Sequence, residues 1–461
     1  MTKHALSNQG GRALAHGDPE LARLLVRALE ASREEPDSLT HGFHSYPARM
    51  HPAIARRVLQ SFPGGLVADP FCGSGTVLVE ARVAGRPSLG VDLNPVAVWL
   101  AEVKTDIRSP AARQRFRQLV RSIGAASEER VRARVDARAP LPPAERKWWG
   151  PHVLKELAGL REEIWSVGHP TDRRLLAMVF SAILVKVSNQ RSDTAEREAP
   201  RRIRKGLSTE IFVRKGLELA DRWDALAEAA GSGSPRPRIV EGDALRFPRF
   251  LSRGQRAELI LSSPPYGGTY DYVDHHARRY AWLGLDPSTM RRAEVGARRH
   301  LRGPEAFGKW DRQVLQMLRA MRSGLAPGGQ VVLLVGDGQL GDRRVDAAQQ
   351  LRRLAPQAGL RAVAGASQLR PDFTGRHKRR EHLVLLVGDG DARPPRFRRG
   401  PRPVGSEGRG AKPGQGRRPA STADDAGRGK RGPKRGRKLG SKGRGPGARR
   451  RRGPGGPKKR R

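Results

Sequence analysis

The sequence predicts an α/β domain with a mostly parallel sheet, a helical insertion and a disordered basic tail at its C-terminal end. Short apolar runs bounded by Gly, Pro or Asp recur along the chain and are typical of buried strands. Helical patterns follow several of these runs. Such alternation requires crossover connections, which place helices on both faces of a parallel sheet.

The expected strands fall in two parts of the chain. They are 66–68, 88–91, 258–261, 330–335 and 382–387. Helical stretches at 76–84 and 95–104 directly follow the first two. We therefore assign residues 41–104 and 236–390 to one sheet domain, and residues 1–40 to an N-terminal extension.

The alternation stops between residues 105 and 235. Helical patterns there cover 113–123, 152–165, 173–187 and 209–230. A structureless connection of this length is implausible inside a compact domain, so residues 105–235 are predicted to form a helical insertion, a candidate target-recognition region. The Arg-rich segment 191–205 within it is either a solvated loop or a loop that contacts phosphates.

Positive charge is concentrated at the end of the chain. The 461 residues include 89 Lys and Arg against 46 Asp and Glu, a formal net charge of +43. Residues 391–461 hold 26 of these cations and 4 of the anions. This tail is rich in Gly, Pro and Arg, so it cannot bury enough apolar surface to offset its ordering entropy. The charge points to a polyanionic partner, either nucleic acid or an anionic membrane surface.

Composition argues against several classes of protein. No run of 18 apolar residues indicates a transmembrane helix, and residues 1–17 lack the apolar core of a secretory signal. The single cysteine, Cys72, permits no intrachain disulfide and no cysteine-based zinc site. We expect a soluble cytoplasmic protein, associated with the nucleoid, with no membrane partner.

The strongest motif is a glycine-containing loop between an expected strand and an expected helix. It reads Asp69-Pro70-Phe71-Cys72-Gly73-Ser74-Gly75-Thr76. Its glycines let the backbone approach a ligand, and the following helix N-terminus presents free N–H groups. Asp92, at the end of the next strand, can accept hydrogen bonds from both ribose hydroxyls of an adenosine. The loop lacks the Gly-x-Gly-x-x-Gly spacing that accommodates a pyrophosphate, so a nucleoside cofactor other than NAD is predicted.

A second motif, Ser263-Pro264-Pro265-Tyr266, follows another expected strand and therefore faces the same crevice. An exocyclic base amine is a poor nucleophile because its lone pair is delocalised into the ring. The Ser263 hydroxyl and the Pro264 carbonyl could accept its hydrogens and expose that lone pair. Paired prolines would fix these acceptors in place, and Tyr266 offers a stacking face for an extruded base.

These motifs resemble those of the amino-group (N4-cytosine and N6-adenine) DNA methyltransferases. The resemblance implies a Rossmann-like class I methyltransferase fold and S-adenosylmethionine as cofactor. It assigns cofactor contacts to Asp69, Phe71, Gly73, Gly75, Thr76 and Asp92, with Phe71 either near the sulfonium or in the core. The segment Phe43-His44-Ser45-Tyr46-Pro47-Ala48-Arg49-Met50 resembles a family segment that helps to enclose the cofactor, so His44 and Tyr46 join the set. Asp243 is placed like the family's acid near the adenine.

The Ser-Pro-Pro-Tyr form is typical of the N4-cytosine branch. The resemblance thus implies a site-specific DNA enzyme, for which a cognate restriction endonuclease is a candidate partner. Three alternatives stay open. The chain could be an N6-adenine DNA enzyme, a THUMP-associated tRNA or rRNA guanine-N2 methyltransferase, or a non-catalytic basic DNA-binding protein. About 40 residues precede His41, fewer than the RNA-binding domain of the THUMP-associated enzymes requires.

Two other features are not expected to carry chemistry. Cys72 lies in the cofactor loop and follows Phe71, so it does not match the Pro-Cys nucleophile of C5-cytosine methyltransferases. His275 and His276 would point about 100° apart on a helix, so no metal site is predicted. A helix beside the active site, with Tyr270 and Tyr272 near the target base, is expected there instead.

Deleting residues 391–461 should weaken DNA binding several-fold at about 0.1 M salt and flatten its salt dependence, because a flexible polycation binds phosphates by releasing counterions. The recognition sequence should not change. Fluorescence anisotropy with full-length and truncated protein measures both quantities. Equal affinities and equal salt slopes would show that the tail is idle, and an altered recognition sequence would show that it reads bases.

Overall fold

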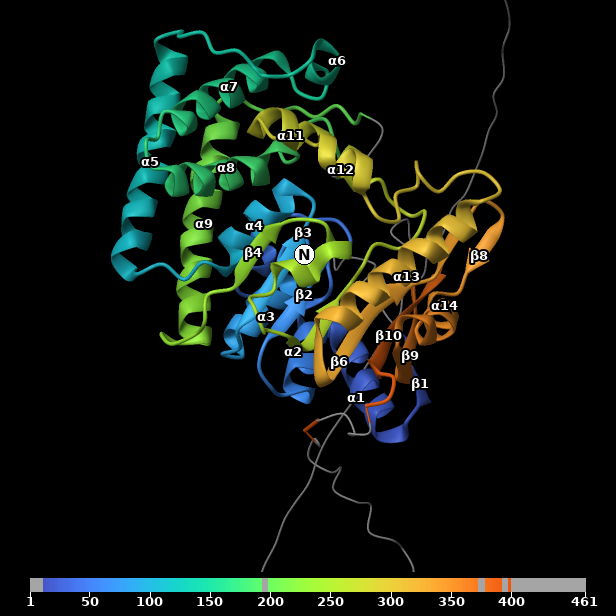
Figure 1. Cartoon of the computed structure of the whole chain (residues 1–461). Helices are drawn as coiled ribbons and strands as arrows, with labels where there is room; N and C mark the ends of the chain where they lie inside the picture. The colour runs from blue at the N-terminus through green and yellow to red at the C-terminus, as the bar shows by residue number, and fades with distance from the viewer. Residues whose placement is uncertain (1–10, 193–197, 372–377, 392–396, 399–461) are drawn as a thin grey trace, which may run out of the picture. The chain divides into compact units, whose positions relative to one another are not determined.

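The computed structural model describes residues 11–192, 198–371, 378–391 and 397–398, and within them the chain forms one large sheet (Figure 1). The strand order is β1-β9-β10-β6-β5-β2-β3-β4. The bounds are β1 Leu14–Gly17, β2 Val67–Asp69, β3 Ser88–Asp92, β4 Arg238–Glu241, β5 Ala257–Ser262, β6 Leu325–Gly336, β9 Leu360–Pro371 and β10 Lys378–Gly388. A separate small hairpin pairs β7 (Gly338–Leu340) with β8 (Arg343–Val345).

Five neighbouring strands of the sheet are parallel. β4, β3, β2, β5 and β6 run in the same direction, whereas β10 is antiparallel to both β6 and β9, and β1 is antiparallel to β9. The prediction of a mostly parallel sheet with a Rossmann-like class I methyltransferase fold is confirmed. All five strands expected from the sequence are present, with ends that differ by a few residues.

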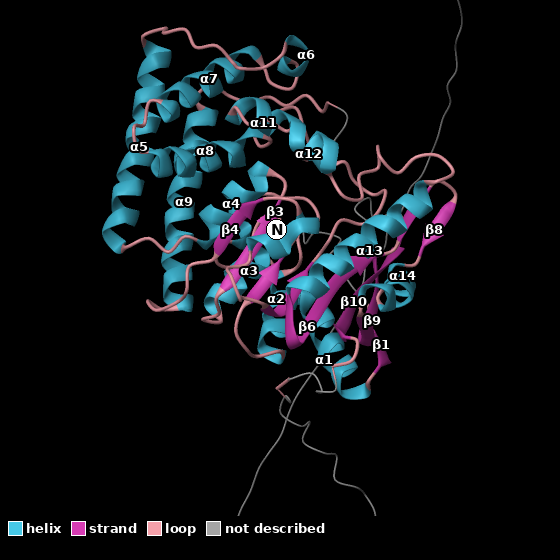
Figure 2. Ribbon diagram, viewed as in Figure 1, coloured by secondary structure: helices cyan, strands magenta, loops and turns pink. Residues whose placement is uncertain are grey.

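Helices cover both faces of the sheet (Figure 2). Alternate residues of β6 pack against different sets of helices, because successive residues of a strand point to opposite faces of the sheet. Val332 and Leu334 pack in the cluster that contains α1 (Pro19–Glu30), α2 (Pro52–Ser61) and part of α3 (Thr76–Val83). Val331 and Leu333 pack with α13 (Ala306–Gly324) and α14 (Ala347–Leu354). Burial on both faces explains why β6 reads as a continuous apolar run.

Residues 11–40, expected to be an extension of the sheet domain, contribute structure to the sheet itself. β1 pairs with β9, and α1 packs in the apolar cluster of one face. β1 is short and all its residues are exposed, so it has no apolar alternation to reveal it. β9 was also missed, because its Ala-, Gly- and Arg-containing sequence has a single β-branched residue, Val363.

The insertion is helical, as predicted. Its helices are α5 (Pro110–Arg132), α6 (Pro143–Arg146), α7 (Pro151–Trp165), α8 (Pro170–Leu184) and α9 (Leu207–Ala230). All of these except α6 share one apolar core with α4 (Pro95–Thr105), which follows β3, and with α11 (Ala277–Leu283). Trp148 and Trp149 are both buried in this core. The insertion is therefore packed onto the cofactor-binding half of the sheet domain.

The remaining short elements lie mostly in connections. They are η2 (Ala31–Arg33), η3 (His41–Phe43), η4 (Ala244–Phe250), α10 (Tyr272–His275), α12 (Ser288–Ala293) and η5 (Pro356–Ala358). The basic tail predicted from residue 391 onward lies outside the described residues, apart from Asp391, Phe397 and Arg398. No helix in the described part combines the length and apolar character needed to cross a membrane.

Candidate active site

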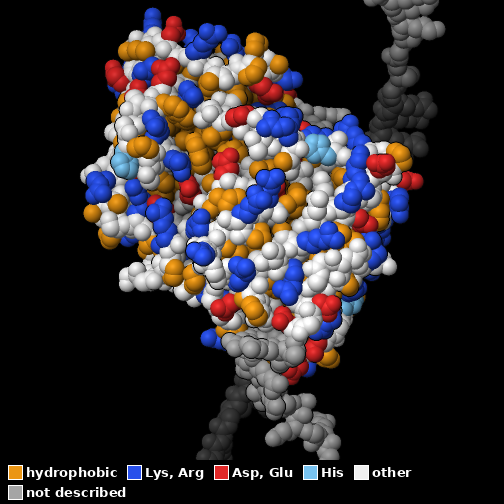
Figure 3. All heavy atoms as spheres, viewed as in Figure 1, with side chains coloured by type: hydrophobic (Ala, Val, Ile, Leu, Met, Phe, Trp, Pro, Cys, Tyr) orange, Lys and Arg blue, Asp and Glu red, His pale blue; other side chains and the backbone are white. Residues whose placement is uncertain are grey.

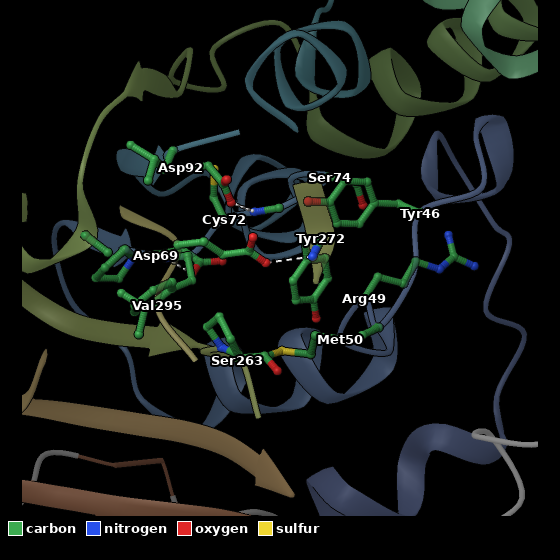
Figure 4. A pocket seen from close by; sticks show the side chains of 18 of the residues that line it. Tyr46, Arg49, Met50, Asp69, Cys72, Ser74, Asp92, Ser263, Tyr272 and Val295 are labelled. Carbon is green, nitrogen blue, oxygen red and sulfur yellow. Dashed lines mark hydrogen bonds between the residues drawn. The ribbon is translucent and has the colours of Figure 1, made fainter. Parts of the chain in front are cut away.

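The loops that follow four neighbouring parallel strands surround one pocket (Figure 4). Parallel strands end at the same edge of the sheet, so segments far apart in sequence converge there. The loop after β2 supplies Asp69 to Thr76, and β3 ends in Asp92. Asp243 follows β4, and Ser263 and Pro265 follow β5. The two motifs found in the sequence thus line a common cavity.

The glycines of the cofactor loop are required by its shape. Gly73 and Gly75 have φ angles of +48° and +82°, which side-chain-bearing residues rarely adopt. A Cβ on Gly75 would come within 2.9 Å of the Ala101 Cβ. Gly75 also precedes α3, whose N-terminus carries Thr76 into the pocket wall. The loop therefore brings backbone close to the cavity, as a cofactor cradle requires.

Asp92 both lines the pocket and holds the glycine loop. Its Oδ2 accepts a hydrogen bond from the Gly73 N–H at 2.8 Å, and its Oδ1 accepts one from the Asn94 N–H at 2.9 Å. Each oxygen retains a second lone pair for a ligand. Burial raises the pKa of Asp92 to about 6. The carboxylate can thus accept hydrogen bonds from a ribose, with its orientation fixed by the backbone.

Asp69 connects the two motifs through the core. Its Oδ1 accepts hydrogen bonds from the Ser262 hydroxyl at 2.6 Å and from the Phe71 N–H at 3.2 Å. Burial raises the pKa of Asp69 to about 7. Ser262 directly precedes Ser263, so this bond fixes the start of the Ser-Pro-Pro-Tyr turn relative to the cofactor loop.

Residues beyond the two motifs complete the wall. Tyr46 lines the pocket, and its ring stacks on His276 with centroids 5.1 Å apart. Tyr272 and Glu294 line the opposite part, where the Glu294 carboxylate accepts the Tyr272 N–H at 2.6 Å and pairs with Arg299 at 2.8 Å. The sequence analysis missed Glu294, Met290 and Val295 as pocket residues, and it did not single out Met50 at the end of the segment 43–50. No local motif marks the first three, because they reach the pocket only through the packing of distant segments.

The lining fits a cationic nucleoside cofactor. Four carboxyl groups line the pocket against one guanidinium: those of Asp69, Asp92, Asp243 and Glu294 against Arg49. S-Adenosylmethionine carries a sulfonium and an ammonium group, which an acidic lining favours. The buried hydroxyls of Ser74 and Thr76 also line the pocket and have no hydrogen-bond partner among the described residues. Buried polar groups are rarely left unpaired, so these two are suited to a ligand.

Most of the predicted site residues line this pocket, but four do not. Tyr46, Asp69, Phe71, Gly73, Thr76, Asp92, Asp243, Ser263 and Pro265 do so. Gly75 lies behind the loop. The His44 ring lies instead between the Ser45 carbonyl (2.6 Å) and the Ser181 hydroxyl (3.0 Å). Pro264 and Tyr266 line a neighbouring cavity beside Trp310.

Tyr266 packs over the end of β6. Its hydroxyl lies 3.4 Å from Glu381 Oε1, and a Cβ at Gly336 would come within 2.4 Å of its ring. Pro265 lines both cavities. The Ser-Pro-Pro-Tyr turn therefore lies between the cofactor pocket and the cavity that contains the Tyr266 ring.

Cys72 is buried in the cofactor loop, and burial raises the pKa of its thiol well above the usual value. A thiol held neutral is a weak nucleophile, in keeping with the sequence interpretation. The stretch with two adjacent histidines forms the short helix α10 (Tyr272–His275), which ends before His276 and whose N-cap, Asp271, pairs with Arg299 at 3.2 Å. Of Tyr270 and Tyr272, Tyr272 lines the pocket and Tyr270 does not.

Substitution of Asp92 by alanine should lower the affinity for S-adenosylmethionine at least tenfold. The change removes the acceptor for two ribose hydroxyls, each charge-assisted bond contributing about 1.5–3 kcal/mol, and it releases the Gly73 N–H. Isothermal titration calorimetry measures the loss. Unchanged affinity would remove the ribose assignment.

Cofactor affinity should also depend on pH through Asp92. Because the pKa of Asp92 is raised to about 6, the ionised acceptor predominates at higher pH and is lost as the pH falls through that value. Affinity measured between about pH 5 and pH 8 should therefore fall toward the acid end. The Asp92→Asn variant should bind more weakly and lose this dependence. A wild-type slope that persists in the variant would assign the titration to another group.

Comparison with known proteins finds similarity to methyltransferases. A family model described as DNA methylase, for N6 and N4 methyltransferases, matches residues 25–103. The Type II methyltransferase M.MvaI of Kocuria varians is 26% identical over 268 residues, which cover 54% of this chain and 58% of that protein. M.MjaII of Methanocaldococcus jannaschii is 36% identical over 75 residues, 16% of this chain and 14% of that protein. The matched regions thus span about half or less of these relatives.

Among solved structures, the rRNA methyltransferase aviRa from Streptomyces viridochromogenes covers 78% of this chain and 96% of its own, with 16% identity and a TM-score of 0.32. TrmN from Thermus thermophilus covers 74% and 49%, with 15% identity and a TM-score of 0.30. The family model and the relatives, taken with the two motifs, carry the assignment. These matches support the amino-group DNA methyltransferase family, and with it S-adenosylmethionine as the cofactor.

Proposed function

We propose that this chain is a site-specific DNA methyltransferase that transfers a methyl group to the exocyclic N4 amine of cytosine. The observation that carries the proposal is that Ser263 lines the same pocket as the cofactor loop and Asp92. A methyl acceptor held by the Ser-Pro-Pro-Tyr turn would thus lie beside the methyl donor. Serine at the first position of that turn favours the N4-cytosine branch of the family.

The roles of the residues follow from their positions. S-Adenosylmethionine supplies an electrophilic methyl group, and its sulfur keeps the electron pair of the broken bond. Asp92 orients the ribose, and the acidic lining favours the cationic end of the cofactor. The Ser263 hydroxyl and the Pro264 carbonyl would accept hydrogen bonds from the amine N–H groups, so that the amine lone pair is turned toward the donor. As the new N–C bond forms, the nitrogen would give up one proton to solvent. Positioning accounts for most of the catalysis in such a direct transfer.

The Ser262–Asp69 hydrogen bond supports this arrangement. It is buried and 2.6 Å long, and it joins β5 to the cofactor loop. Paired prolines restrict the backbone directly after Ser263. The acceptors are therefore preorganised and need little rearrangement when the base enters.

We propose the insertion, residues 105–235, as the region that recognises the target sequence. It packs onto α4 of the cofactor half and onto α11, which follows the Ser-Pro-Pro-Tyr turn. DNA bound by the insertion would thus be held in a fixed position relative to the cofactor loop and to the Ser-Pro-Pro-Tyr turn.

The product of the reaction tests the proposal. Incubation of the pure protein with labelled S-adenosylmethionine and either DNA or RNA, followed by nucleoside mass spectrometry, should yield N4-methylcytosine in DNA. N6-methyladenine alone would overturn the base assignment and leave the mechanism intact. Methylated guanosine in RNA would support the THUMP-like alternative, and failure to bind the cofactor would support a non-catalytic protein.

The Tyr266→Ala variant should lose most of its turnover and keep a near-normal affinity for S-adenosylmethionine, because Tyr266 lies outside the cofactor pocket. Tyr266→Phe is the matched control. It keeps the stacking face and removes only the hydroxyl near Glu381, so it should retain most of the activity. Equal losses in both variants would show that the hydroxyl, not the ring, is the functional group.

A further inference from the structure

A second groove lies on the other side of the loop that encloses the cofactor pocket. Tyr46, Pro47 and Arg49 line both cavities, so residues 42–49 form a shared wall. The helical insertion supplies the facing wall, with Lys186 after α8 and Lys215 in α9. Figure 4 shows the Arg49 guanidinium pointing away from the cofactor pocket. We call this cavity the loop–insertion groove.

The two cavities have opposite electrostatic character. Carboxyl groups predominate in the cofactor pocket, whereas the loop–insertion groove is lined by Arg49, Lys186 and Lys215 against one carboxylate, Asp37. Asp37 pairs with Arg49, and Lys215 pairs with Glu218, so the excess of positive charge in the groove comes from Lys186. The groove therefore suits an anion, while the pocket beside it suits a cation.

The two lysines of the groove differ in their exposure to solvent. The Lys215 side chain is only 6% exposed, and its ammonium lies 2.7 Å from Glu218 and 5.6 Å from the Phe43 ring centroid. Burial lowers the pKa of Lys215, and the positive charge of Lys186 lowers it further. Lys186 itself is exposed on the turn after α8. Because Glu218 already neutralises Lys215, a bound anion would be attracted chiefly by Lys186.

The Arg-rich segment that follows is attached to the same turn. The Ala199 N–H donates to the Asn189 carbonyl at 2.7 Å, and Arg201 bonds to the Asn189 side chain and to the Lys186 carbonyl at 3.3 and 3.4 Å. Exposed Ser45 and Ser192 add hydroxyl groups to the groove wall. Cationic side chains and hydroxyls are the groups that proteins place against nucleic-acid phosphates.

We propose that the loop–insertion groove binds a backbone phosphate of the DNA substrate. The proposal rests on the proposed function, since it assumes that the polyanion is the substrate. An enzyme that extrudes a base must hold the neighbouring backbone against the cost of unstacking, and the groove adjoins the loop that covers the cofactor. Basic side chains are also spread over the face shown in Figure 3, so the groove would be one contact within a larger basic surface.

Charge changes at Lys186 test the groove. In fluorescence anisotropy with a short duplex, Lys186→Ala should weaken DNA binding about three- to tenfold at about 0.1 M salt and reduce the slope of log K against log[salt] by about 0.9, the value for one phosphate. Lys186→Glu should weaken binding further. Arg253 is exposed on the turn before β5, at the opposite edge of the sheet from the site, so Arg253→Ala and Arg253→Glu are matched controls.

The outcomes distinguish a DNA-binding groove from one that has no role in DNA binding and from one that binds the cofactor. Loss of DNA affinity in the Lys186 variants, with the Arg253 variants near wild type and S-adenosylmethionine affinity intact, is the expected result. Lys186 variants that bind DNA like the Arg253 variants would overturn the proposal. An equal loss of cofactor affinity in the absence of DNA would assign the groove to the cofactor instead. Thermal melting verifies that each variant folds.

The same measurements distinguish failure of this inference from failure of the proposed function. Wild-type protein that methylates DNA while its Lys186 variants bind normally would refute only the groove. Wild-type protein that methylates RNA alone would refute the proposed function and the DNA assignment together. Binding measured on that RNA would then show whether Lys186 contacts a phosphodiester at all.

Discussion

The buried hydrogen bond between the Ser262 hydroxyl and Asp69 is the contact on which the arrangement of the site depends. It joins neighbouring strands β2 and β5 at the edge where both end. On one side of it lies the cofactor loop, and on the other the Ser-Pro-Pro-Tyr turn. A buried carboxyl is costly unless it is paired or protonated, and the raised pKa of Asp69 reflects that cost. The hydrogen bond offsets part of it and fixes two functional loops relative to one another.

The loop formed by residues 42–49 separates two environments of opposite charge. One face completes an acidic pocket suited to a cationic cofactor, and the other faces the lysines of the insertion. Ala48, at the turn of this loop, has a φ of +54°, a left-handed conformation that costs about 1–2 kcal/mol for a residue with a side chain. Packing around the loop sustains that conformation. Tyr46 is held on one side by its stack on His276.

The insertion and the sheet domain are joined by a continuous apolar core. The largest buried side chains of this core include Trp223, Trp282 and Phe180, which come from α9, α11 and α8. Trp223 also donates from its indole N–H to the Val103 carbonyl in α4 at 2.8 Å. The insertion is thus attached through a buried core to the helix that follows Asp92. If the insertion recognises the target sequence, as proposed above, this attachment would fix the position of the target base relative to the pocket.

The sequence by itself determined the parallel core of the sheet, the cofactor loop with Asp92, and the Ser-Pro-Pro-Tyr turn. Strands buried on both faces are apolar throughout, and glycine-containing turns are local features, so both can be recognised in a short window of sequence. It did not reveal β4, the strand at the edge of that parallel core, nor β1 or β9. These strands lack a clear apolar pattern and are strands because of their partners.

Tertiary structure alone decided which distant residues share a cavity. Glu294 entered the cofactor pocket, whereas His44 and Tyr266 faced neighbouring cavities. Lys186 and Lys215 were brought to the loop at residues 42–49 by the packing of the insertion on α4. Contacts of this kind depend on the angles at which helices and strands pack. Those angles are set by interactions between segments far apart in the sequence, so no local sequence pattern reveals them.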